Sequence, residues 1–191
     1  SRVPLARVQS DRGRGDDAEA EIRDLLATAE RELADQPEDL ALVVVAARTV
    51  LSLVYFRRHE LTEALTWLTA VRDQADRVPH AITRAAYHRQ VAIVHEVQQG
   101  YSAAIRHLNI ALQLYDQVLF EPGRYDVYWS LSLSYTDMGD LRTARLCLEQ
   151  CSGIAERLDL KLELGKSKSS FAELEVREGH YEAAGARYRG D

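Results

Sequence analysis

The most reactive side chains in this sequence are two cysteines four residues apart. On one helix, the spacing of Cys147 and Cys151 would direct both thiolates toward one metal ion. No Cys or His pair with zinc-like spacing accompanies them, and structural zinc sites usually have four ligands. Cys151 also falls where Val71 and Ala111 stand in the repeat described below. We therefore expect small buried apolar residues here, with no metal ion and no cofactor.

Two histidines offer a second kind of chemistry, because imidazole titrates near neutral pH. With a carboxylate, His88 and His95 could form an acid–base site. However, His95 stands where Tyr55 and Tyr135 stand forty residues before and after it, which predicts a packed ring. No H-E-x-x-H, nucleophile elbow or EF-hand loop appears in the sequence. We expect a protein that is not an enzyme.

The tetrapeptide Leu-Gly-Lys-Ser at 164–167 ends like a phosphate-binding loop. That loop needs a Gly five residues before Gly165 and a preceding strand, whereas residue 160 is Leu and its surroundings are helical. We expect no nucleotide site.

Composition places the chain among ordinary globular proteins, with 46% hydrophobic and 28% charged residues in 191. Only 4 Pro, together with abundant Ala, Leu, Arg and Glu, favour helix. The longest apolar run, Leu40 to Ala47, is far shorter than the roughly 20 residues of a membrane helix. No secretory signal opens the chain. We expect an all-α cytoplasmic protein without a membrane segment.

The formal net charge of −6 is unevenly placed. Residues 1–15 form a basic arm with four Arg and one Asp, so the remainder of the chain is acidic. An acidic surface repels phosphate backbones. The main domain is therefore not expected to bind nucleic acid.

A pattern of large and small residues recurs every forty residues. A large apolar residue is followed by a small one at Leu51-Ser52, Val91-Ala92, Leu131-Ser132 and Phe171-Ala172. Ala stands in the same column of all four units, at Ala64, Ala104, Ala144 and Ala184. Small residues let two helices approach closely, so each unit predicts a pair of antiparallel helices. A Gly such as Gly139 or Gly179 suits the turn between them.

These columns resemble the tetratricopeptide repeat, and the forty-residue unit is similar to the extended repeats of kinesin light chains and of bacterial signal-transducing regulators. The resemblance covers about residues 45–191. It departs where the family places a large aromatic residue early in the first helix, because Arg48, His88 and Lys168 stand there. The resemblance implies a right-handed superhelix, an α-solenoid, whose concave side is lined by the first helices.

We expect one domain over residues 16–191, with a capping helix at 17–35 and repeats that start near 38, 81, 124 and 161. The remaining helices are predicted at 38–57, 60–77, 81–98, 101–119, 124–138, 141–158, 161–178 and 180–189. Pro37, Pro79 and Pro122 punctuate the connections between these units.

The resemblance also implies a partner-binding groove on the first helices. Its apolar anchors are expected to be Leu53, Ile93, Trp129 and Leu133, and its orienting cations Arg57 and Arg89. The whole predicted groove set is Leu53, Phe56, Arg57, Arg89, Ile93, Glu96, Trp129, Leu133 and Arg177. The alternative is that long helices curl the superhelix tightly and bury the apolar residues Leu53, Ile93 and Leu133 against neighbouring helices.

The function indicated is a non-catalytic scaffold that binds a protein or peptide segment, as part of a larger bacterial-type regulator. One alternative is a peptide-sensing domain that controls a fused DNA-binding or signalling domain. Another is a homodimer formed through the C-terminal helix.

Overall fold

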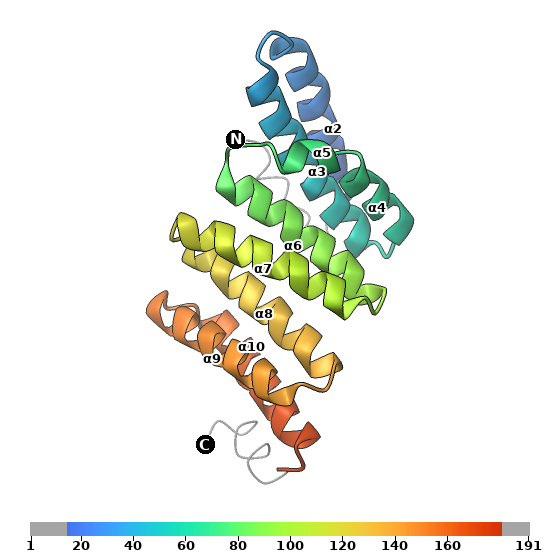
Figure 1. The fold of residues 1–191 in the computed structure, drawn as a ribbon. Helices are drawn as coiled ribbons and strands as arrows, with labels where there is room; N and C mark the ends of the chain where they lie inside the picture. Colours follow the sequence, from blue (N-terminus) through green and yellow to red (C-terminus); the bar gives the residue numbers. More distant parts are fainter. Residues whose placement is uncertain (1–14, 181–191) are drawn as a thin grey trace.

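The computed structural model describes residues 15–180, and within that range it contains helices and no strand. The arm before Gly15, the helix predicted at 180–189 and Ala184 lie outside this range. The helices are α2 (Gly15–Glu32), α3 (Pro37–Arg57), α4 (Leu61–Thr69), α5 (Arg72–Ala75), α6 (Ala81–Val97), α7 (Tyr101–Gln117), α8 (Glu121–Asp137), α9 (Leu141–Arg157) and α10 (Lys161–Arg177). They stack along one direction from α2 to α10, which makes the predicted all-α superhelix of paired helices (Figure 1).

The forty-residue period is visible in the backbone. First helices end at Arg57, Val97, Asp137 and Arg177, and two residues later the chain takes a positive φ at His59, Gln99, Gly139 and Gly179. The next backbone N–H then donates to a carbonyl five residues back, at Glu60, Gly100, Asp140 and His180. This is a helix-ending turn with a left-handed residue. In the first two described pairs the left-handed residue is not glycine.

The predicted alanine column is buried in the three helix pairs where the structure describes it. Ala64, Ala104 and Ala144 have no exposed surface at all. The neighbouring leucines Leu108 and Leu148 are also almost fully buried. A side chain without a γ carbon therefore separates the two backbones, as the sequence pattern predicts.

Two helix predictions are wrong, one in the interior of a helix and one at its start. The helix predicted at 60–77 is broken, because α4 ends at Thr69, Val71 adopts a non-helical φ of −118° and α5 resumes at Arg72. In the third pair, α8 begins at Glu121 and takes Pro122 into its first turn. Proline is tolerated there because the first N–H groups of a helix have no intrahelical acceptor.

The N-terminal helix α2 is fastened to α3 by a polar network. Tyr55 donates a hydrogen bond to Glu19 at 2.6 Å, and Arg58 forms an ion pair with the same carboxylate at 2.6 Å. Arg23 donates to the Tyr55 hydroxyl at 2.9 Å and also lies over the Trp67 ring. These contacts hold α2 against the C-terminal end of α3.

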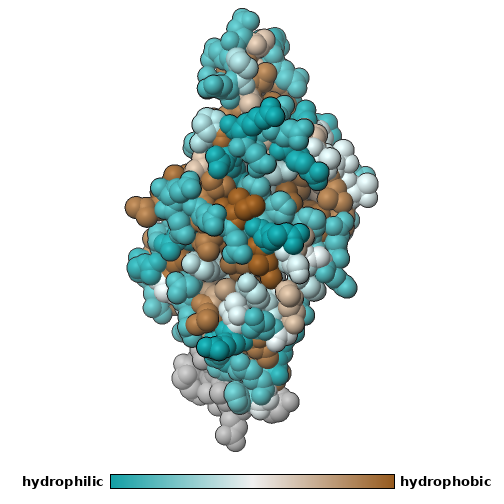
Figure 2. All heavy atoms as spheres, viewed as in Figure 1, coloured by the Kyte–Doolittle hydropathy of each residue, from teal (hydrophilic) through white to brown (hydrophobic). Residues whose placement is uncertain are grey.

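Among the described residues, α3 alone is long and apolar enough to cross a membrane by length and composition. Its residues Val45, Leu51 and Val54 are fully buried. They belong to the cluster of buried apolar side chains between Ala18 and Val94, which we call the first core cluster. In Figure 2 the surface is hydrophilic at the α2 end, and hydrophobic patches gather over the middle of the stack.

Candidate functional site

The first helices α3, α6, α8 and α10 carry the predicted groove residues, and we call their shared side the first-helix face. Among these first helices, α3 packs against α6, and α6 packs against α8. Leu53 and Ile93 are half-buried, and Leu133 keeps 38% of its surface exposed. We call these three residues the apolar stripe. One member on each of three successive first helices remains accessible to solvent to some degree.

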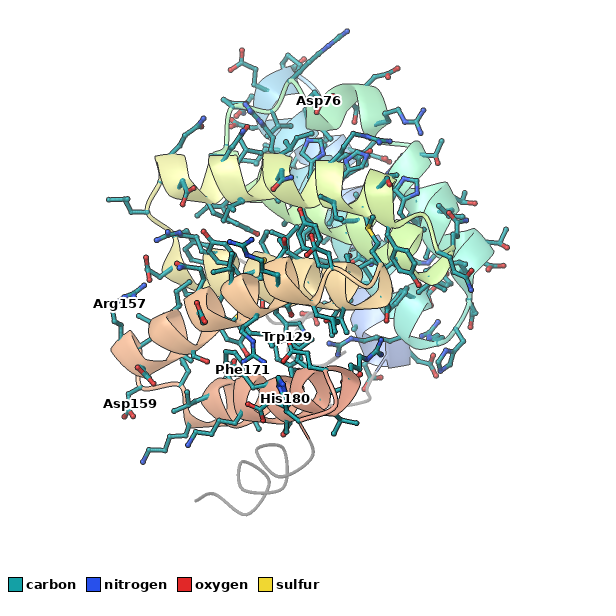
Figure 3. The ribbon with its side chains drawn as sticks, turned by 60° about the horizontal axis from the view of Figure 1, so that its bottom comes forward. Asp76, Trp129, Arg157, Asp159, Phe171 and His180 are labelled. Atoms are coloured by element: carbon teal, nitrogen blue, oxygen red, sulfur yellow. The ribbon has the colours of Figure 1, made fainter. Side chains whose placement is uncertain are left out.

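Trp129 contributes more to packing than its predicted role as an anchor suggests. Its ring stacks on Tyr125 with centroids 6.4 Å apart, and it packs against two core clusters. Trp129 packs against the cluster that contains Phe171, and the two residues lie near each other beside α10 in Figure 3. The indole therefore joins two repeats, and only part of it is accessible to a ligand.

The two other predicted residues of α3 differ in exposure. Phe56 is half-buried and packs against the first core cluster, whereas Arg57 is exposed at the end of the helix. This end of the face thus offers a guanidinium beside aromatic surface.

The cation predicted on α6 already has a protein partner. Arg89 forms an ion pair with Asp126 of α8 at 3.2 Å, and only 16% of the Arg89 side chain is exposed. The pair spans two first helices and neutralises the charge of both members. A ligand that uses Arg89 must share it with Asp126.

Glu96 is the most perturbed carboxyl on the face. Its Oε1 atom accepts a hydrogen bond from Ser134 Oγ at 2.6 Å. Burial raises the pKa of Glu96 to about 7, and Asp137 acts in the same direction, while the Ser134 hydroxyl and Arg89 lower it. Near neutral pH this carboxyl is therefore present in both protonation states.

Arg177 closes the C-terminal end of the described face. It donates to the backbone oxygen of Thr136 at 3.4 Å and forms an ion pair with Glu173 at 3.0 Å. Its side chain is 42% exposed, so it lies at the edge of the face.

These cross-helix partners were not paired by the sequence reasoning. Glu96 meets Ser134, Arg89 meets Asp126 and Arg177 meets Thr136 at separations of 38, 37 and 41 residues. The signal that would have found them is complementary polar residues about one repeat apart on first helices.

The cysteines and the Leu-Gly-Lys-Ser segment all lie within helices. Both cysteines are buried free thiols, and burial raises the pKa of Cys147 to about 11. Gly165 lies inside α10, so the Leu-Gly-Lys-Ser segment is helical. Within residues 15–180, no group of three or more His, Cys, Asp or Glu side chains is arranged to hold a metal ion.

His88 and His95 are indeed packed rings, but they share their surroundings with a third histidine. His88 is buried and His95 half-buried, and both stack on His107 of α7. His107, and Asp76, whose carboxylate lies 3.2 Å from His88 Nε2, were not singled out from the sequence. No motif marks them, because Asp76 lies in the turn after α5 and His107 lies in α7.

The fold matches solved structures of helical repeat proteins. A kinesin light chain-like protein of Podosopora anserina with nearly identical TPR-like repeats gives a TM-score of 0.71 at 18% identity, over 100% of this chain and 91% of that one. RapI in its apo form gives 0.72 at 14% identity, over 97% and 78%. BtubC (BKLC) of P. vanneervenii gives 0.71 at 12%, over 91% and 71%.

No protein-family model matches the sequence, and no curated protein matches it significantly. The structural similarity nevertheless defines the class: the chain has a tetratricopeptide-like repeat fold, as its residue columns predict.

Proposed function

We propose that the chain is a non-catalytic scaffold that binds a protein or peptide segment along the first-helix face. The observation that carries this proposal is the apolar stripe, in which Leu53, Ile93 and Leu133 recur at forty-residue intervals with partial exposure. An extended or helical segment has apolar side chains at regular intervals that suit such a row. Solvent-accessible apolar rows on soluble proteins usually mark interaction sites.

Polar groups beside the stripe would orient the segment. Arg57 and Arg177 stand at opposite ends of the described face and are exposed. Guanidinium groups recognise carboxylates and backbone carbonyls through several N–H donors. The stripe would then supply affinity, and the two ends would set direction.

The experiment is a selection of peptides from a displayed library on the purified chain, followed by anisotropy titration of one selected peptide. We expect Ile93→Ser and Leu133→Ser each to weaken binding about tenfold, the loss of a well-packed apolar contact. The matched control is Leu146→Ser on α9, because Leu146 is also exposed, at 53%, but does not lie on the first-helix face.

Trp129→Ala is not a suitable test, because removing a ring packed between repeats changes the fold as well as the face. If the selected peptide binds Leu133→Ser and Ile93→Ser as tightly as the wild type, the face is not the binding site. Equal weakening by Leu146→Ser would also contradict the proposal.

We further propose that the chain is part of a larger cytoplasmic regulator of bacterial type, in which the bound segment changes the curvature of the stack. Small rotations per repeat accumulate along a solenoid, so binding at one face can move its ends. The two free, buried thiols suit a reducing compartment. A DNA-binding or signalling region in the same reading frame is expected. A sedimentation mass that rises with concentration would instead favour the homodimer.

A further inference from the structure

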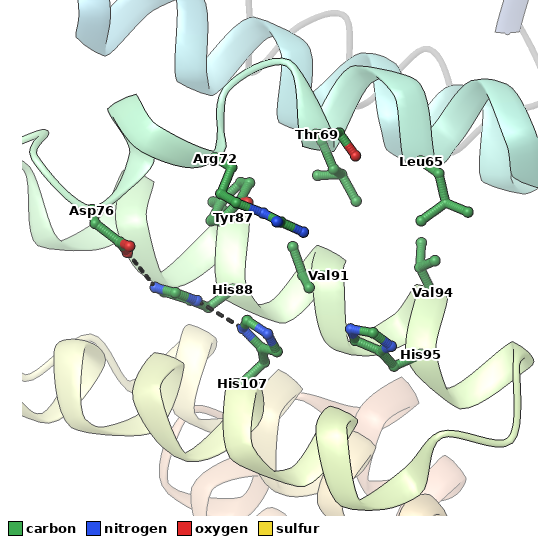
Figure 4. Close-up of a pocket in the computed structure, with 11 residues that line it drawn as sticks. Leu65, Thr69, Arg72, Asp76, Tyr87, His88, Val91, Val94, His95 and His107 are labelled. Carbon is green, nitrogen blue, oxygen red and sulfur yellow. Dashed lines mark hydrogen bonds and ion pairs between the residues drawn. The ribbon is translucent and has the colours of Figure 1, made fainter.

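A cavity of about 400 Å³ lies where α4 and α5 face α6 and α7, away from the apolar stripe. The break between α4 and α5 borders it, with Thr69 on one side and Arg72 on the other (Figure 4). The volume is in the range of small-molecule pockets, roughly 300–1,000 Å³.

The floor of the cavity holds a hydrogen-bonded string of three side chains. His88 Nε2 lies 3.2 Å from Asp76 Oδ1, and His88 Nδ1 lies 3.0 Å from His107 Nδ1. A carboxylate only accepts, so His88 Nε2 carries the hydrogen of the first bond. Neutral His88 then has a bare Nδ1, which accepts from the Nδ1–H of His107. The other nitrogen of His107, Nε2, is left as an acceptor.

One added proton reverses the direction of the hydrogen bond between His88 and His107. A protonated His88 donates from both nitrogens, so His107 Nδ1 must accept, and the hydrogen of His107 moves to Nε2. His107 Nε2 thus changes from acceptor to donor, on a ring that lines the cavity. The change needs no movement of either ring.

The remaining walls divide by polarity. Leu65, Val91 and Val94 form an aliphatic side, and Arg72 extends its guanidinium beside Tyr87 toward Val91 (Figure 4). The acidic group of the lining, Asp76, is engaged by His88. The cavity therefore offers an apolar wall beside a cation and a proton-dependent donor.

We propose that this cavity binds a small carboxylate with an apolar body, and that binding is coupled to the uptake of one proton by the Asp76–His88–His107 string. The carboxylate meets Arg72 and the Nε2–H of His107, and the hydrocarbon lies along Leu65, Val91 and Val94. The proton enters because an anion favours the donor form of His107.

The surrounding charges agree with a string that is neutral when empty. Burial lowers the pKa of His88, and burial followed by the neighbouring His88 and His95 lowers the pKa of His107 to about 4. The charged and titratable groups that face these rings are Asp76, Arg72, Arg84, His95, Arg106 and the Tyr87 hydroxyl. The side chains from α4 (Leu65, Leu68 and Thr69) carry no charge. A bound anion would therefore favour protonation of these two histidines, which their surroundings otherwise disfavour.

The test is isothermal titration calorimetry of the full chain with octanoate, at about pH 6 and about pH 8 in two buffers of different ionisation enthalpy. We expect binding about a hundredfold tighter at the lower pH, because the uptake of close to one proton per octanoate changes the affinity about tenfold per pH unit. Octanol, which has the same body without the charge, should bind weakly and without pH dependence. N-acetyl-leucine tests whether the carboxylate of a chain end fits as well as a free acid.

Two variants assign the site. Arg72→Gln should weaken octanoate binding about tenfold at both pH values, and His107→Gln should abolish the pH dependence. Arg142→Gln on α9 and Leu133→Ser on the first-helix face are controls that should bind like the wild type. The proposal is overturned if octanoate does not bind at millimolar concentration, or if Arg72→Gln and His107→Gln bind it unchanged. Neither result depends on the peptide groove.

Discussion

Buried titratable side chains set the pH behaviour of this protein. Glu96 sits between two first helices with its carboxyl hydrogen-bonded to Ser134, and His107 sits behind α6 against His88. Burial disfavours the charged form of both groups, so it raises the pKa of the carboxyl and lowers the pKa of the imidazole. Their contributions to stability therefore fall in different windows.

Glu96 should destabilise the fold as pH rises. Its pKa is about 7 in the folded protein against an ordinary value of 4.5, so the stability it contributes is present below 4.5 and is lost as pH rises through 7. We expect Glu96→Gln to raise the free energy of unfolding at about pH 8 by about 1–2 kcal/mol and to leave it nearly unchanged at about pH 5. Urea unfolding at both pH values measures this. Glu149→Gln on α9 is the control, and an equal gain there would contradict the assignment.

His107 should destabilise the fold as pH falls. Its pKa of about 4 lies below the ordinary 6.5, so its contribution is complete above 6.5 and is lost as pH falls toward 4. The midpoint of thermal unfolding should therefore decline over that window in the wild type, and less steeply in His107→Gln. Parallel declines in the two proteins would show that the ring does not remain neutral in the folded state.

At the scale of helices, the turn at the end of each first helix is the repeated device. A left-handed residue at the same position and the same backbone hydrogen bond end all four described first helices, whether that residue is Gly139 or Gln99. The sequence places glycine one residue late in the second pair, at Gly100, where φ is negative. The left-handed backbone position therefore recurs every forty residues, although glycine does not occupy it in every repeat.

Exchanging residues at this turn should change stability in opposite directions. Gln99→Gly should stabilise the protein by about 0.5–1 kcal/mol, because glycine adopts positive φ without a steric penalty, and Gly139→Ala should destabilise it by about 1 kcal/mol. Denaturant midpoints with an unchanged m-value measure both effects. Changes of the same sign would mean that the turn is not left-handed in solution.

The start of α8 depends on a glycine for packing. A Cβ at Gly123 would lie 2.6 Å from the Tyr115 ring and 2.7 Å from Phe120. Gly123→Ala should therefore destabilise the protein by about 1–3 kcal/mol. Gly165→Ala in α10 meets nothing within 4 Å and should be neutral or stabilising through helix propensity. Thermal unfolding of the two variants checks the contrast.

At the scale of the whole molecule, the stack is held by contacts between neighbouring helices. Stability in such an array is nearly a sum of unit and nearest-neighbour terms. Ala144→Leu should separate α8 from α9, because Ala144 has no exposed surface. We expect hydrogen exchange to accelerate in α8, α9 and α10 while α2 and α3 keep their protection. Uniform acceleration along the chain would instead indicate a single cooperative unit.

The spacing of Ala64, Ala104 and Ala144 with their large neighbours was sufficient to predict helix pairs and their repetition, because close helix contact restricts a position to small side chains whatever surrounds it. Tertiary structure decided how far Leu53, Ile93 and Leu133 are accessible to solvent. It also decided that Arg89 pairs with Asp126 and that Trp129 packs between repeats. The break after Thr69 and the meeting of Asp76, His88 and His107 beside it were decided in the same way. Periodicity encodes contacts within a unit, whereas contacts between units depend on how far each pair rotates against the next, and no single column of residues sets that angle.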